Sequence, residues 1–159
     1  MGMNPDYNVE TKRCSRYGQV QGNSVHVKSF NVNDWEKSTY GILGPDEIVI
    51  KDSEIGIVFS YPLEKPFEFK FKSEGGFTKK GLFHCITEQY KKIYKEEQES
   101  SEIDVEKAQK ERTGYMALCM NRPTSNGKYG IWGHSIGDLW IEGIEYNSET
   151  KKVHLSIGS

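Results

Sequence analysis

One stretch of the chain, residues 78–97, carries apolar side chains at the spacing that a long amphipathic helix requires. On a helical wheel the apolar residues fall on one contiguous face, namely Leu82, Phe83, Ile86, Tyr90, Ile93 and Tyr94. Thr78 precedes this face and is a good N-cap, because its hydroxyl can accept a hydrogen bond from the first turn. An isolated helix of this length is marginal in water, so we expect a sheet to bury its apolar face.

The cleanest strand pattern lies at residues 67–72, where phenylalanine alternates with charged residues. This alternation places Phe67, Phe69 and Phe71 on one face of a sheet. We expect that face to pack against the helix, because both are apolar and a short glycine-rich turn joins the two elements.

Further strand patterns occupy residues 25–28, 47–51, 54–61, 139–146 and 153–157. We predict that the segments 47–51 and 54–61 form a hairpin at the centre of the sheet. Gly143 marks a β-bulge, because the alternation of apolar residues changes phase there.

These elements predict an α+β fold. The sheet is mostly antiparallel with about five to seven strands, because short turns join consecutive strands, and the helix at 78–97 is the one principal helix across it. Strands and helices do not alternate, which argues against a Rossmann-type fold. We expect residues 1–159 to form a single domain in which the charged segment 98–113 is a mobile excursion, although residues 100–112 also suit a short solvated helix. For residues 115–120 the pattern leaves helix and strand both open.

The composition argues against several classes of function. The net charge is −2, so the chain lacks the basic surface on which nucleic-acid binders depend. No apolar run is long enough to span a membrane, and no secretion signal opens the chain, so we expect an intracellular protein, cytoplasmic or nuclear. The cysteines are scattered, which predicts free thiols in a reducing compartment: Cys14, Cys85 and Cys119.

Most ionisable residues have an ordinary interpretation. Three histidines stand in the polar phase of regular elements and are expected to face solvent: His26, His84 and His154. Cys85 borders the apolar face of the helix and is expected to pack in the core. The acidic residues near the helix end are interpreted as a solvated run: Glu96, Glu97 and Glu99. No phosphate loop, metalloprotease, serine-hydrolase or EF-hand spacing occurs, so we expect no metal and no cofactor.

The glycine-punctuated segment 128–138 is the best candidate for a site. Asp138 could orient the His134 ring in a general-base pair, and these two are the candidate catalytic residues. The candidate ligand-binding residues are Tyr129, Trp132, His134 and Arg122, with Lys128 as a second contact for an anion. The alternative is purely structural: the glycines permit tight turns, Trp132 and Ile136 anchor the loop, and His134 satisfies buried backbone groups.

The missing catalytic signature favours a non-enzymatic binding or assembly module, acting through protein–protein interaction or as a structural unit. The alternative is a small-molecule-binding protein or a hydrolase-like enzyme that uses the 128–138 loop with His134. A nucleic-acid-associated protein is the third hypothesis, which the acidic balance weakens. We therefore expect a protein partner first and a small molecule second, with no membrane partner, and leave oligomerisation open.

Overall fold

The computed structural model describes residues 9–13, 21–25, 29–33, 44–114 and 120–159. Residues 115–119 lie outside them, so the helix and strand alternatives at 115–120 stay untested, as do the predictions for His26, Cys14 and Cys119. Its elements are β1 Val9–Arg13, β2 Gln21–Val25, β3 Phe30–Asn31, β4 Ile48–Ile50, β5 Glu54–Phe59, β6 Phe67–Lys72, β7 Phe77–Thr78, α2 Lys79–Ser100, α3 Val105–Glu111, the 3₁₀ helix η3 Ile136–Asp138, β8 Trp140–Asn147 and β9 Lys152–Gly158.

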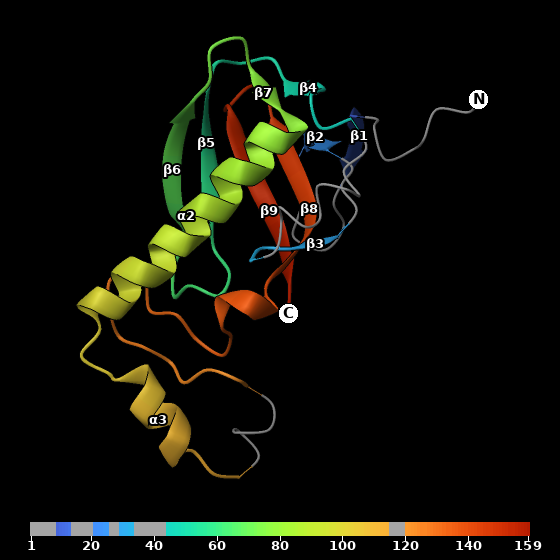
Figure 1. Ribbon diagram of the computed structural model, residues 1–159. Coiled ribbons are helices and arrows are strands. Elements are labelled where there is room, and N and C mark those ends of the chain that lie inside the picture. Colours follow the sequence, from blue (N-terminus) through green and yellow to red (C-terminus); the bar gives the residue numbers. More distant parts are fainter. Residues whose placement is uncertain (1–8, 14–20, 26–28, 34–43, 115–119) are drawn as a thin grey trace.

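A seven-stranded sheet forms one layer of the fold, with the strand order β1-β2-β8-β9-β5-β6 and with β3 paired to β8 (Figure 1). Neighbouring strands are antiparallel except β5 and β9, which run parallel. The α+β prediction is therefore confirmed, while the sheet itself is mixed. The bulge at Gly143 is also confirmed, because the β8–β9 register shifts between Ile141 and Gly143.

The predicted hairpin of residues 47–51 and 54–61 is wrong. β4 pairs with β7 in a separate two-stranded sheet, whereas β5 lies between β6 and β9 in the main sheet. The start of α2 holds the segment before β4, since the N–H groups of Lys79 and Lys80 donate to the carbonyls of Glu47 and Pro45 at 2.9 and 3.0 Å. Apolar alternation identifies a strand but does not identify its neighbour, which is why the pairing was missed.

Helix α2 crosses one face of the main sheet (Figure 1). Its N-cap is Thr78, whose Oγ1 accepts from the Gly81 N–H at 3.0 Å, as the sequence predicted. The residues of its apolar face that are fully buried are Leu82, Phe83, Ile86, Tyr90 and Ile93. The helix continues three residues past the predicted end at Glu97 and closes when the Ser101 N–H donates to the Glu97 carbonyl at 2.9 Å.

The phenylalanines of β6 pack against the core but stay half-buried: Phe67, Phe69 and Phe71. Phe69 reaches the helix through Phe59, with ring centroids 5.7 Å apart, and Phe59 in turn contacts Tyr90 at 4.9 Å. The predicted face is therefore correct, but its burial is incomplete because β6 is the last strand in the sheet order.

The charged segment after α2 forms a second, short helix. Asp104 caps α3 by accepting from the Lys107 N–H at 3.0 Å, and α3 has no buried residue. Arg112 ties the segment back to the body through the Met120 carbonyl at 2.7 Å. Neither α2 nor α3, the α-helices of the described residues, is long and apolar enough to cross a membrane.

Candidate functional site

A buried carboxylate at the end of α2 organises the loop 125–131. Glu97 is 0% exposed. Its oxygens accept hydrogen bonds from the Ser125 hydroxyl at 2.7 Å and from the N–H groups of Tyr129 at 2.7 Å, Gly127 at 2.8 Å, Gly130 at 3.2 Å and Ile131 at 3.4 Å. Successive backbone donors that converge on one anion form a nest, so the loop is wrapped around a carboxylate that the protein itself supplies.

This environment keeps Glu97 ionised. Burial raises the pKa of the Glu97 carboxyl, but the hydrogen bonds from Tyr129, Ser125 and the neighbouring N–H groups outweigh burial and bring the pKa below its ordinary value. Glycine at position 127 lets the loop approach the Glu97 carboxylate, because a Cβ there would lie only 2.7 Å from Glu97 Oε2. The interpretation of Glu97 as a solvated residue is wrong. The signal for burial was present, since Glu97 follows Tyr90 and Ile93 at helical spacing.

Arg122 faces into the protein. It is 7% exposed, and its Nη1 donates to the Ile131 carbonyl at 2.9 Å. Its Nη2 donates to the Ser125 hydroxyl at 3.1 Å, and that hydroxyl in turn donates to Glu97. The guanidinium carbon also lies 5.6 Å from the centroid of the Tyr94 ring. The guanidinium of Arg122 therefore donates to loop carbonyls and to the Glu97 network. These hydrogen bonds use N–H groups of Arg122 that the sequence analysis assigned to an anionic ligand.

Tyr129 is part of the core as well. It is 1% exposed, its ring meets that of Phe67 at 4.7 Å, and its hydroxyl donates to Glu96 Oε2 at 2.6 Å. Lys128 reaches the same Glu96 oxygen at 2.9 Å. Glu96 and Lys128 therefore hold the solvent side of the loop, while Glu97 binds the same loop from the buried side.

His134 joins two aromatic rings at the surface. Its ring lies 5.8 Å from that of Tyr61 and 6.0 Å from that of Trp132. The Ser159 hydroxyl stands 3.3 Å from His134 Nε2 and 2.8 Å from the Tyr61 hydroxyl. The backbone is fixed too, because the Tyr94 hydroxyl donates to the His134 carbonyl at 2.9 Å. The result is a cluster in which the half-buried rings of Tyr61, Trp132 and His134 meet the exposed Ser159.

Asp138 has other partners. Its Oδ2 accepts from the Ser135 N–H at 3.0 Å and from the Asn121 side chain. Asn121 Oδ1 accepts from the same N–H at 3.0 Å. Asp138 therefore fixes the start of η3. Of the residues predicted for the site, the structure brings His134 and Trp132 together, while Arg122 and Tyr129 belong to the Glu97 network.

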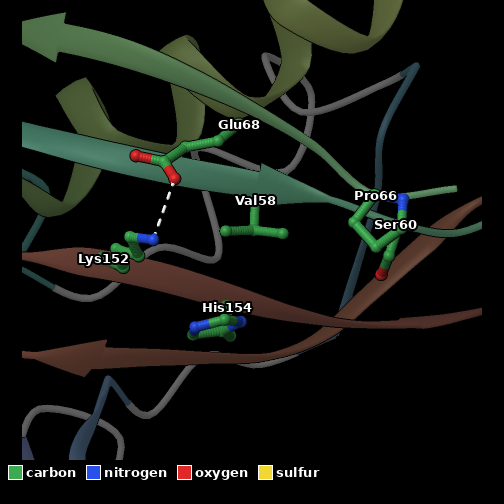
Figure 2. Close-up of a pocket in the computed structure, with 6 residues that line it drawn as sticks. All are labelled: Val58, Ser60, Pro66, Glu68, Lys152 and His154. Atoms are coloured by element: carbon green, nitrogen blue, oxygen red, sulfur yellow. Dashed lines mark ion pairs between the residues drawn. The ribbon is translucent and has the colours of Figure 1, made fainter. Parts of the chain in front are cut away.

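The face of the main sheet that lies opposite α2 carries a hollow of about 500 Å³, which the sequence did not indicate (Figure 2). It is lined by Val58, Ser60, Pro66, Glu68, Lys152 and His154. The Glu68 carboxylate crosses β5 to reach Lys152 Nζ at 3.1 Å, and it binds Lys70 Nζ at 2.7 Å. A Cβ on Gly56 would lie 2.4 Å from Glu68 Oε1, so glycine makes this crossing possible. The hollow depends on the parallel β5–β9 pairing, which local periodicity does not predict.

The free edge of β6 borders this hollow. In the strand order of the described residues β6 is terminal. The Ser73 N–H donates to the Ser53 carbonyl at 2.8 Å, so Ser53 and Ser73 form a hydrogen-bonded pair. In an antiparallel ladder hydrogen-bonded and non-hydrogen-bonded pairs alternate, so every second pair of β5 and β6 from there on is hydrogen-bonded. The intervening residues therefore point their N–H and C=O groups at the open edge: Glu68, Lys70 and Lys72.

The chain matches no protein-family model, no curated protein and no solved structure in the comparisons with known proteins. Within the described residues no group of three or more histidine, cysteine, aspartate or glutamate side chains is placed to hold a metal ion. Three features of the described residues remain as candidates for a function: the Glu97 network, the His134 cluster and the β6 edge.

Proposed function

We propose that this protein is a non-enzymatic binding module that takes an extended polypeptide segment at the open edge of β6. The proposal rests on one observation. β6 combines a row of outward-pointing backbone groups at Glu68, Lys70 and Lys72 with an apolar face that is only half covered. An added strand would form hydrogen bonds with these backbone groups and cover the exposed part of the apolar face. This is the physical basis of recognition by strand addition.

The burial gradient across the sheet supports this reading. The β5 residues opposite the phenylalanines are at most 1% exposed: Ile55, Ile57 and Phe59. The β6 residues Phe67, Phe69 and Phe71 are half-buried although they lie on the same face. The difference arises because β5 has a strand on each side, whereas β6 has one on one side within the described sheet. Apolar surface of this kind on a sheet edge favours association.

The internal network supports a binding role over a catalytic one. Glu97 of α2 and Arg122 are buried ionisable groups that make hydrogen bonds to the loop backbone and are linked to each other through Ser125. A catalytic acid or base has to reach a substrate, whereas these two groups reach the protein's own loop.

The proposed strand addition is tested with a peptide of neutral charge. The probe is residues 65–74 of this chain with threonine at positions 68, 70 and 72, since threonine is a good strand former. Titrated into ¹⁵N-labelled protein, it should shift and protect the amides of Glu68, Lys70 and Lys72, which point at the edge. A peptide that carries proline instead of threonine at position 70, which removes an N–H that would donate to β6, is the matched control and should leave them unchanged. Shifts confined to other elements, or none, would contradict the proposal.

A small-molecule site at the His134 cluster is the second candidate function. The observation in its favour is that the Tyr61, Trp132 and His134 rings contact one another, while the Tyr61 hydroxyl and the His134 ring both lie beside the Ser159 hydroxyl. Aromatic walls with a few polar groups are typical of ligand sites. The same arrangement also suits a packed surface cluster, and a ligand screen given in the Discussion separates the two.

A further inference from the structure

We infer that the segment bound at β6 is β6 of a second copy, paired antiparallel about a two-fold axis at Phe69. This rests on the proposed function and names its partner. The two sheets would then join edge to edge into one continuous sheet, with the helices α2 of both copies on the same side. In Figure 1, β6 borders the sheet on the side away from β1, so the two sheets would join there.

The residues of β6 are self-complementary in this register. With the axis at Phe69, this residue faces its own equivalent, Phe67 faces Phe71, and Glu68 faces Lys70 of the second copy. Aromatic pairs and opposite charges directly across two strands both stabilise a sheet. The pairs between Glu68 and Lys70 are also those whose N–H and C=O groups point at the edge, so each pair exchanges backbone hydrogen bonds.

Neighbouring registers are less complementary. With the axis at Lys70, Glu68 faces Lys72 but Lys70 faces its own equivalent, and with the axis at Glu68 two carboxylates face each other. Like charges directly opposite are destabilising. An axis between two residues is worse, because it would place phenylalanine on the face of charged residues. Among the registers centred on residues 68 to 70, only the axis at Phe69 places no like charges opposite each other, so the charges on this edge favour that register.

The pairing also closes on itself. A two-fold interface uses the same surface on both copies, so a dimer leaves no second β6 edge for a third copy. Pro66 precedes β6 and has no N–H to offer, which limits the ladder at its end. In this register Lys72 of the second copy lies opposite Pro66, at the rim of the hollow in Figure 2 and next to Glu68. The hollow thus receives a lysine side chain beside a carboxylate.

A charge-swap experiment tests the inference. In Glu68→Lys each interstrand pair becomes lysine against lysine, and in Lys70→Glu each becomes glutamate against glutamate. Mixed together, the two variants restore opposite charges in both pairs. By sedimentation velocity over a concentration series, the wild type should approach the mass of a dimer. The dissociation constant of each variant's dimer should rise at least about tenfold. An equimolar mixture of the two variants should form a heterodimer with a dissociation constant like that of the wild-type dimer.

Two exposed positions on α2 provide matched controls. Lys95→Glu and Glu99→Lys make the same changes of charge away from β6 and should dimerise like the wild type. Circular dichroism of every variant shows whether it is folded. A wild type that stays monomeric, or variants that dimerise unchanged, would overturn the inference. If the threonine peptide still binds at β6 in that case, the proposed strand addition stands and only the second copy is excluded as its partner.

Discussion

The N–H of Tyr129 donates to the Glu97 carboxylate at 2.7 Å across 32 positions of sequence. This contact joins the last turn of α2 to the loop that leads into the His134 cluster. Since Glu97 receives the other loop donors as well, a single buried side chain holds the loop that precedes that cluster.

Replacing Glu97 with glutamine should destabilise the protein. The amide has nearly the same shape, but its NH₂ group is a donor where the loop offers further donors, and the negative charge is lost. We expect the free energy of unfolding in urea to fall by about 3 kcal/mol, as for other broken buried networks with a charged member. The control is Glu99→Gln on the exposed side of the same turn, which should change it by less than about 0.5 kcal/mol. A similar small loss in both variants would show that the network contributes little.

The contribution of Glu97 should depend on pH in a defined direction. Its pKa is lower in the folded protein than the ordinary value of 4.5. A lowered folded pKa gives stability that is fully present above 4.5 and is lost as the pH falls through the folded pKa. The difference in unfolding free energy between wild type and Glu97→Gln should therefore be constant near neutral pH and shrink below pH 4.5. A difference that grows on acidification would contradict the lowered pKa.

Alanine at Gly127 should disturb the same network from the loop side. The added Cβ would lie 2.6 Å from Ser100 Oγ and 2.7 Å from both the carbonyl oxygen and Oε2 of Glu97. Overpacking of this kind costs about 1–3 kcal/mol. Gly137→Ala is the matched control, because nothing lies within 4 Å of a Cβ at that position. Thermal unfolding should show a lower transition temperature for Gly127→Ala than for Gly137→Ala. Equal transition temperatures would count against a close approach of the loop to Glu97 at Gly127.

The segment 98–113 should be the first to be cut in limited proteolysis. α3 has no buried residue. Side-chain hydrogen bonds tie the segment to the body near its two ends, from Ser101 and Glu102 to Asn126 and from Arg112 to the Met120 carbonyl. Few buried contacts mean that little free energy opposes local opening. Mass spectrometry of the early fragments should place the cut between Ser101 and Arg112. An early cut within 125–131 would show that the Glu97 network holds its loop less firmly than its hydrogen bonds indicate.

A ligand of the His134 cluster should perturb two rings together. In a fragment screen by NMR, a true binder should shift the His134 ring and the Trp132 indole and leave His154, on the other face of the sheet, unchanged. His134→Ala should abolish the shift of Trp132. If no fragment moves the two rings jointly, the cluster is a packed surface feature and the small-molecule hypothesis is excluded.

Local signals in the sequence were sufficient for much of the secondary structure. The helix with its Thr78 cap, the alternating strand 67–72 and the bulge at Gly143 were each predicted from neighbouring residues, because helix caps and strand faces depend on spacings of a few positions. His134 and Trp132 were predicted to share a site for a similar reason, since they stand two positions apart in one loop. That they lie together is an observation, and that they bind a ligand remains a prediction.

The tertiary structure alone decided which strands are neighbours and which donors surround the buried carboxylate of Glu97. β5 lies beside β9 and β4 beside β7, although periodicity placed β4 and β5 in one hairpin. Glu97 belonged by charge to a solvated run, and within the part of the chain that the structure describes its donors come from the loop 125–131, about thirty positions away. The sequence by itself determined the local elements and the self-complementary pattern of β6, because these depend on residues close along the chain. The burial of Glu97 and the open edge of β6 depend on contacts between distant segments, whose pairing no local pattern specifies.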